Sequence, residues 1–289
     1  MTAPVHSPAP QFSSAFPVQR THLGHALMSE WTKIRTVRST MWTLGVMLVL
    51  ILGINLLVVG LASTESVSDP VLGFGLFGVL LGQLCVMTLG VLVISSEYGT
   101  GMIRTTLTAC PQRGRVLVAK AIVFFALTFT VTTVACALAA LMNYATFGGR
   151  PVGDDTFVGA RLVVEDGLTT ASGTQWLGAT VGVGLYVALL GLLSLAVGAL
   201  LRHSAGAITT MMGVVLLPLI IAIFMQSESL RKVQEKLVEY SSPNAIASLY
   251  QMPMLENGDA DGVRQLVVLA IITAVALGAA CATLSKRDV

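Results

Sequence analysis

Residues 95–120 read SSEYGTGMIRTTLTACPQRGRVLVAK, and long apolar runs lie on both sides of this stretch. It gathers charges, glycines and Pro111 within a chain that is otherwise strongly apolar. Only 11% of the 289 residues are charged, 54% are hydrophobic and the mean hydropathy is +0.81. Soluble domains usually carry about a quarter charged residues. The composition therefore indicates a membrane protein, and the quoted stretch is expected to lie outside the membrane.

Six apolar stretches are long enough to cross a bilayer, whose hydrocarbon core of about 30 Å needs roughly 20 helical residues. Backbone groups in lipid must be paired within the protein, and the alternation typical of barrel strands is absent. We therefore expect an all-α membrane protein with six transmembrane helices. The expected spans are 40–62, 71–95, 117–142, 176–200, 205–226 and 264–284.

The distribution of charge between the loops predicts the orientation. If the N-terminus is inside, the inner segments hold eleven Lys and Arg with three acids, and the outer segments hold six with twelve. An excess of Lys and Arg marks the cytoplasmic side. We therefore expect a multi-pass protein with both termini in the cytoplasm.

The chain before the first span divides into two parts. Residues 1–20 are rich in Pro and Ser and are expected to form a disordered tail, so that the transmembrane domain comprises residues 21–289. Residues 21–38 have the apolar period of an amphipathic helix lying in the inner interface; the alternative is an ordinary basic flank. Its anchor and basic residues are Trp31, Lys33, Arg35 and Arg38.

Two outer segments are long. Residues 143–175 are acidic and rich in glycine, with no clear period. Residues 227–262 begin with helical spacing and continue with a less polar part that Pro243 and Pro253 interrupt. We expect this second segment to form helices, the later part of which turns back toward the membrane.

Several classes of chemistry lack their residues. There is no G-x-x-x-x-G-K-[ST] motif for nucleotide phosphates, and no His or Lys accompanies a nucleophile at membrane depth. The four His and four Cys show no metal-ligand spacing, and no basic patch suits nucleic acid. We therefore predict neither an enzyme nor a metal site, and no cofactor or nucleic-acid partner for this chain.

Residues 96–115 have the features of a rigid cytoplasmic loop. Residues 102–109, MIRTTLTA, resume helical character for about two turns, and Pro111 ends them. A short helix held between two spans is suited to transmit force from a soluble partner. Taken alone, the residues favour a plainer interpretation, a basic loop that lies on lipid headgroups.

The stretch resembles the cytoplasmic loop of ABC-2 type transporter permeases. In that family an acidic residue and an aromatic precede a Gly-Thr run with Arg, Thr and Leu, and a Pro, an Arg and a Lys follow, the Lys opening the next span. The helix before span one and the six-span layout are also similar, over residues 21–289. The positions that match, and that the resemblance assigns to coupling with an ATPase, are Glu97, Tyr98, Gly99, Thr100, Arg104, Thr105, Leu107, Pro111 and Arg113, with Lys120 opening span three.

The resemblance implies the membrane subunit of an ATP-driven exporter in a plasma membrane, and the composition hints at a bacterial source. ATP and Mg would be bound by a separate ATPase subunit, and a second permease copy, identical or homologous, would complete the pathway. The cargo would be amphiphilic or hydrophobic: a drug, an antibiotic, a peptide or a lipid. No substrate-binding residue can be transferred.

Two other functions stay open. The chain could be a non-transporting scaffold or sensor that uses residues 227–262 as a receptor surface. It could also be an ion-coupled carrier. The absence of charged residues from the span centres disfavours a carrier, since such proteins usually place Asp, Glu, Arg or His inside the bundle.

Overall fold

The structure is a computed structural model and describes residues 22–62, 65–101, 113–153, 160–225, 227–255 and 261–286. Within these ranges, six helical segments are long and apolar enough to cross a membrane, which confirms the expected six-helix layout. They are α2 (Arg38–Leu61), α3 (Leu76–Gly99) with the preceding turn Gly73–Gly75, α5 (Arg113–Phe147), α7 (Val183–Leu201) with its lead-in, α8 (Ser204–Phe224) and α11 (Val263–Lys286).

The helices on either side of the quoted stretch extend farther into it than the sequence predicts, and α5 is also longer than expected. Helix α3 continues past residue 95 to Gly99 and ends where Gly101 adopts a positive φ of 73°, the left-handed geometry that commonly ends helices. Helix α5 starts at Arg113 and continues to Phe147, five residues beyond the expected limit. The boundaries 96–115 and 117–142 are therefore wrong, because polar residues near a helix end extend the helix beyond its apolar part.

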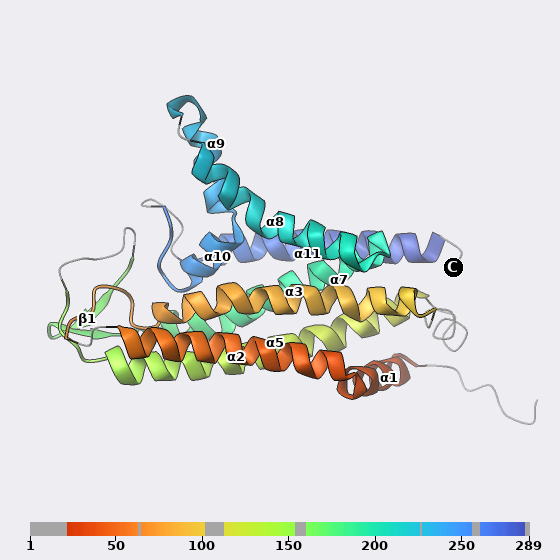
Figure 1. The fold of residues 1–289 in the computed structure, drawn as a ribbon, viewed down its shortest axis with the longest axis horizontal. Helices are drawn as coiled ribbons and strands as arrows, with labels where there is room; N and C mark the ends of the chain where they lie inside the picture. The colour runs from red at the N-terminus through yellow and green to blue at the C-terminus, as the bar shows by residue number, and fades with distance from the viewer. Residues whose placement is uncertain are drawn as a thin grey trace, which may run out of the picture.

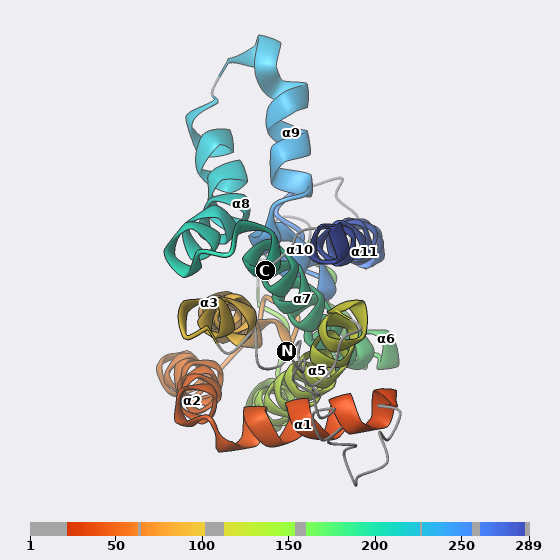
Figure 2. The same cartoon turned by 90° about the vertical axis from the view of Figure 1, so that its right-hand side faces the viewer.

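Helix α7 occupies the centre of the bundle, surrounded by α3, α5, α8 and α11 (Figure 2). It continues a span that begins with α6 (Gly173–Leu177) and a π turn (Gly178–Gly182), and 78% of the most apolar window of this span is buried. Glycines permit the close packing. A Cβ on Gly90 of α3 would overlap the carbonyl oxygen of Gly191 of α7, so the two backbones are in direct contact.

Two pairs of glycines spaced four residues apart also lie at helix contacts. A Cβ on Gly78 would lie 2.6 Å from the carbonyl oxygen of Ile51, and one on Gly82 would lie 2.8 Å from the Ile51 side chain. Gly178 and Gly182 both face Leu249. Spacings of four residues thus bring α3 against α2, and the π turn against the segment that holds Leu249.

The segment 143–175 contains a small hairpin that the sequence analysis did not predict. Strands β1 (Val163–Glu165) and β2 (Leu168–Thr170) pair antiparallel, so the described chain is not entirely helical. Asp166 and Gly167 form the turn with φ of 50° and 79°. Asp-Gly is the residue pair that favours a two-residue turn with both φ positive.

The segment after α8 contains two helices of different character. Helix α9 (Arg231–Glu239), which follows a 3-10 turn (Glu228–Leu230), has no buried residue and projects from the bundle (Figure 1). Helix α10 (Ser242–Leu249) is buried at all eight positions, among α3, α7, α8 and α11. The expected helical segment is therefore present, and its later part lies inside the helical bundle.

The elements outside the spans gather at two opposite ends of the bundle (Figure 1). One end holds α1 (Leu23–Thr36), the ends of α3 and α11, and the start of α5. The other end holds the hairpin, α9 and α10. Arg38 begins α2, so the helix expected over 21–38 ends earlier, at Thr36.

Candidate functional site

Five of the nine predicted coupling positions fall in the described part of the chain. Glu97, Tyr98 and Gly99 form the last turn of α3, Thr100 caps it, and Arg113 is the first residue of α5, described by its backbone only. The other four lie outside the described residues, as does the tail 1–20. These four are Arg104, Thr105, Leu107 and Pro111.

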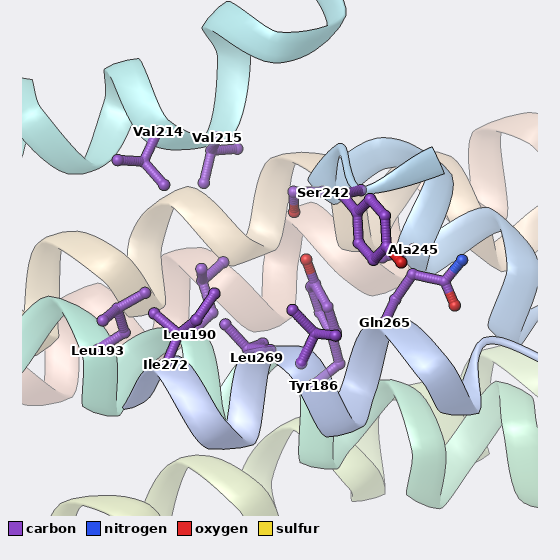
Figure 3. A pocket seen from close by; sticks show the side chains of 12 residues that line it. Tyr186, Leu190, Leu193, Val214, Val215, Ser242, Ala245, Gln265, Leu269 and Ile272 are labelled. Atoms are coloured by element: carbon purple, nitrogen blue, oxygen red, sulfur yellow. The ribbon is translucent and has the colours of Figure 1, made fainter. Parts of the chain in front are cut away.

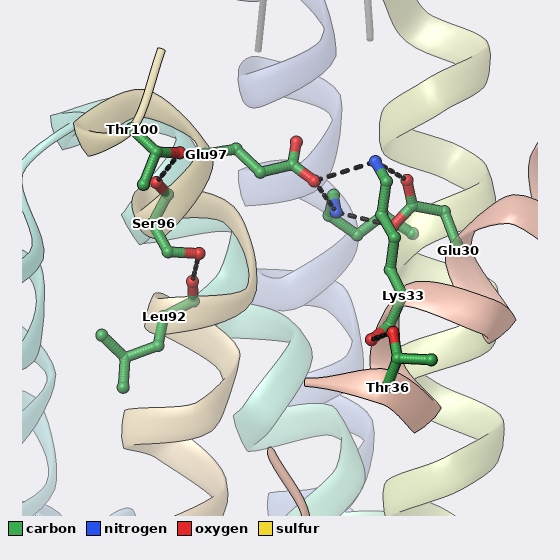
Figure 4. Close-up of polar contacts among 8 residues, drawn as sticks. Glu30, Lys33, Thr36, Leu92, Ser96, Glu97 and Thr100 are labelled. Carbon is green, nitrogen blue, oxygen red and sulfur yellow. Dashed lines mark hydrogen bonds and ion pairs between the residues drawn. The ribbon is translucent and has the colours of Figure 1, made fainter. Parts of the chain in front are cut away.

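Glu97 belongs to a group of four charged side chains from three helices, which we call the buried ion-pair cluster: Glu30, Lys33, Glu97 and Lys120 (Figure 4). The Lys120 Nζ lies 2.6 Å from Glu30 Oε2 and 2.9 Å from Glu97 Oε1. The Lys33 Nζ lies 3.0 Å from Glu30 Oε1 and 3.1 Å from the same Glu97 oxygen. The four contacts form a closed ring, so α1, α3 and α5 are joined pairwise by charge.

The position of each residue in its helix explains the cluster. Glu30 and Lys33 are three residues apart in α1 and share one face of it. Glu97 lies two residues before the end of α3, and Lys120 lies two turns after the start of α5. The end of α3 and the start of α5 therefore both lie beside α1.

The cluster is nearly closed to solvent. The side chains of Lys120, Glu30 and Glu97 are 2%, 3% and 7% exposed, and Lys33 covers the outside at 27%. Burial disfavours the charge of Lys33, but attraction by Glu30 and Glu97 outweighs it and raises the pKa of Lys33. Two carboxylates and two ammonium groups balance, so the removal of one leaves a buried charge uncompensated.

The carboxylate of Glu97 keeps one acceptor open. Its Oε2 is buried and accepts no hydrogen bond from any residue within the described ranges. The residues next along the chain are those of the loop, of which 102–112 lie outside the description. Glu97 Oε2 can therefore still accept a hydrogen bond.

Tyr98 links the end of α3 to the turn between α7 and α8. The guanidinium carbon of Arg202 lies 5.3 Å from the centre of the Tyr98 ring, a cation–π distance. Arg202 has a left-handed φ of 54° and ends α7, and α8 begins two residues later. Helices α7 and α8 are therefore joined by a tight turn, and the last turn of α3 touches it.

Helix α1 packs against the bundle along the face of Glu30 and Ile34, which are buried. Trp31 is 45% exposed and Leu23 40%, and Arg35 and Arg38 are exposed as well. Lys33, which the sequence assigns to the interface, instead takes part in the buried ion-pair cluster. The interfacial position of α1 stays a prediction.

Sequence reasoning did not include Glu30 among the functional residues, and it gave Lys120 only as the residue that opens span three. Glu30 is the single acid in a basic segment, and Lys120 stands a full turn inside an apolar stretch. Both are unfavourable placements unless a partner exists, because a charge in an apolar surrounding needs its counter-ion. These two unfavourable placements were the signal in the sequence that could have indicated both residues.

Comparison with known proteins adds no relative: no family model matches the chain, and no curated protein matches it. Within the described residues, no group of three or more His, Cys, Asp or Glu side chains could hold a metal ion. The site joins α1, α3 and α5 through buried ion pairs.

Proposed function

We propose that this chain is the transmembrane subunit of an ATP-driven exporter of the ABC-2 permease type. A separate ATPase subunit would press on the 96–115 region and on α1 from the cytoplasm, where both termini would lie. The observation that carries the proposal is the buried ion-pair cluster, which ties α1 to both helices that flank this region. A displacement of α1 or of the loop would be passed to α3 and α5 together.

The packing of α3 and α5 supports a path toward the rest of the bundle. Both lie against the central helix α7, and at Gly90 and Gly191 the backbones of α3 and α7 are in direct contact. Tyr98 with Arg202 adds a second contact, from the end of α3 to the α7–α8 turn. Rigid contacts of this kind transmit a displacement with little loss.

The first experiment tests whether an ATPase subunit is bound to the chain in its native membrane. We expect that affinity purification of the chain from its native membranes in mild detergent recovers an ATP-hydrolysing subunit in a fixed ratio, together with a second permease copy. Recovery of the permease alone, in a form that still transports with ATP or an ion gradient, would overturn the proposal.

The second experiment tests whether the loop couples ATP hydrolysis to transport. In proteoliposomes that contain both subunits, Glu97→Gln and Arg104→Gln should leave ATP hydrolysis but lower the cargo moved per ATP. Arg231→Gln on α9 removes a charge of the same kind at the opposite end and should change neither rate. The cargo is to be sought among amphiphilic and hydrophobic compounds, and coupling equal to wild type in both loop variants would contradict the role of the loop.

A second candidate function rests on α9. None of its nine residues is buried, and it projects beyond the spans as a charged helix with Val233 exposed, next to the exposed Leu230 of the preceding turn. Such a helix suits a receptor surface, as in a sensor that transports nothing. Loss of signalling or assembly on deletion of 228–239, with transport of every tested compound absent in the wild type, would favour this function.

A further inference from the structure

A cavity of about 450 Å³ lies between α7, α8, α10 and α11, on the opposite side of the bundle from α1 and α2 (Figure 2). Its walls are Leu190 and Leu193 of α7 and Leu269 of α11, all buried. Figure 3 shows Val214 and Val215 of α8 facing them. The volume falls within the range of about 300–1,000 Å³ typical of small-molecule sites.

The cavity opens sideways. Its rim includes Val214 of α8 and Ile272 of α11, which are 54% and 49% exposed on the flank of the bundle. Both residues lie in helices long and apolar enough to cross a membrane. In a bilayer the opening between α8 and α11 therefore faces lipid, and an occupant would enter from the membrane.

The polar groups of the cavity gather near α10. Tyr186 of α7 and Ser242 of α10 both line the cavity, and Ser242 Oγ donates to Gln83 Oε1 at 2.7 Å. Gln265 is 3% exposed, and its Oε1 accepts no hydrogen bond from the described residues. Figure 3 shows Gln265 beside Tyr186, at the other end of the cavity from Leu193. One buried acceptor is thus left open at the polar end of the cavity.

The lining also defines the charge of an occupant. None of the twelve residues that line the cavity carries a charge, so a charged headgroup would be buried without a counter-ion. A neutral head that donates one hydrogen bond matches the open acceptor of Gln265, because the last torsion of a Gln side chain is soft and can turn the amide. The apolar remainder suits a hydrocarbon chain.

We propose that this cavity binds a neutral single-chain lipid of the surrounding bilayer, a monoacylglycerol or long-chain alcohol. Its hydroxyl head lies beside Gln265, and its chain runs along Leu190, Leu193 and Leu269. The site lies apart from the buried ion-pair cluster and stands whether or not the chain is a permease.

The test uses the full chain in phosphatidylcholine nanodiscs that contain a monoacylglycerol with a photoactivatable diazirine in its acyl chain. After irradiation, mass spectrometry locates the adducts. We expect saturable labelling of the cavity segments of α7 and α11, which unlabelled monoolein displaces. Labelling that never saturates, or that is equally strong at Val275 on the lipid-facing side of α11, would show ordinary lipid contact and overturn the proposal.

Two variants should abolish occupancy. Val214→Trp places a ring at the exposed rim, where it does not disturb the core, and Leu269→Trp fills the cavity from within. Each should lower saturable labelling at least about tenfold, since a bulky side chain leaves no room for a second occupant. Ile271→Trp, on the same helix but 59% exposed and outside the cavity, is the matched control and should label as wild type. Wild-type labelling of Val214→Trp would also refute the site, even if Leu269→Trp fails to fold.

The role of Gln265 has its own test. Gln265→Leu should weaken the competition by monoolein about two- to tenfold, the range expected for one hydrogen bond. Competition by the dimethyl ether of monoolein, in which both hydroxyls are methylated and no hydrogen-bond donor remains, should be the same in the variant and the wild type. A site that prefers an anionic fatty acid to monoolein would contradict the neutral head.

Discussion

The two ends of the bundle both carry ion pairs, but the surroundings of these pairs differ. At one end, Glu30, Glu97 and Lys120 are almost fully buried and join three helices that are far apart in sequence. At the other end, Arg231 pairs with Glu235, and Glu239 pairs with Lys236 and Arg264, with the basic partners exposed by 59% or more. The comparison teaches that burial, and not the number of pairs, decides how much stability depends on a charge cluster.

The largest effect is expected at the buried end. Lys120→Met leaves Glu30 and Glu97 with Lys33 as their only partner in the cluster, so a carboxylate is buried without full compensation. We expect the free energy of unfolding to fall by about 3–5 kcal/mol, measured by SDS titration of the purified protein. Lys236→Met at the exposed end is the matched control, and an equal loss in both variants would remove the contrast between the two ends.

A double variant tests whether Glu97 and Lys120 at the buried end act as a pair. Glu97→Gln combined with Lys120→Met removes one charge of each sign and keeps the Glu30–Lys33 pair at 3.0 Å. The double variant should be more stable than the sum of the two single losses predicts, by about 0.5–3 kcal/mol. Additive losses in the same titration would mean that Glu97 and Lys120 do not act as a pair.

The next largest effect is expected in the pH dependence of stability at the buried end. The pKa of Lys33 is raised above its ordinary value of about 10.4, so its contribution to stability is complete below that pH and is lost as the pH rises through the higher, folded value. Wild type should therefore lose more stability than Lys33→Met between about pH 10 and 12. Parallel pH curves for the two proteins would contradict this prediction.

The smallest effect is expected at the exposed end. The hydrogen bond from Lys236 and the attraction of Arg264 outweigh burial and hold the pKa of Glu239 below its usual range. Its contribution is therefore present above the ordinary pKa of about 4.3 and lost as the pH falls through the lower, folded value. Because both partners are exposed, Glu239→Gln should shift the unfolding midpoint only slightly, and its difference from wild type should vanish in acid.

The sequence predicted the six spans well, because composition and length alone decide which segments cross a membrane. It could not predict the cluster, since the partners of Lys120 lie 90 and 23 residues away along the chain. The hairpin at 163–170 was also missed, although Asp166 and Gly167 are a strong turn signal, because three-residue strands leave no detectable alternation.

The sequence partly indicates the central position of α7. Gly184, Gly191 and Gly198 are spaced seven residues apart, and their neighbours lie on α5 and α3. A repeat of small residues at this spacing indicates a face in close contact with other helices. The loop residues Arg104, Thr105, Leu107 and Pro111 stay predictions, because they lie outside the described ranges.

The π turn at Gly178–Gly182 has a consequence for the part of span four that precedes it. A π turn holds one residue more than an α turn, so deleting one residue there should restore ordinary helical winding without breaking the span. The wider turn already absorbs the extra residue, so the segment before the deletion should keep its orientation against α7. Gln175, whose Nε2 donates to the Arg161 carbonyl at 2.9 Å, should keep that hydrogen bond. Deletion of a residue within the regular part of α7 would instead rotate everything before it by about 100° and break this contact.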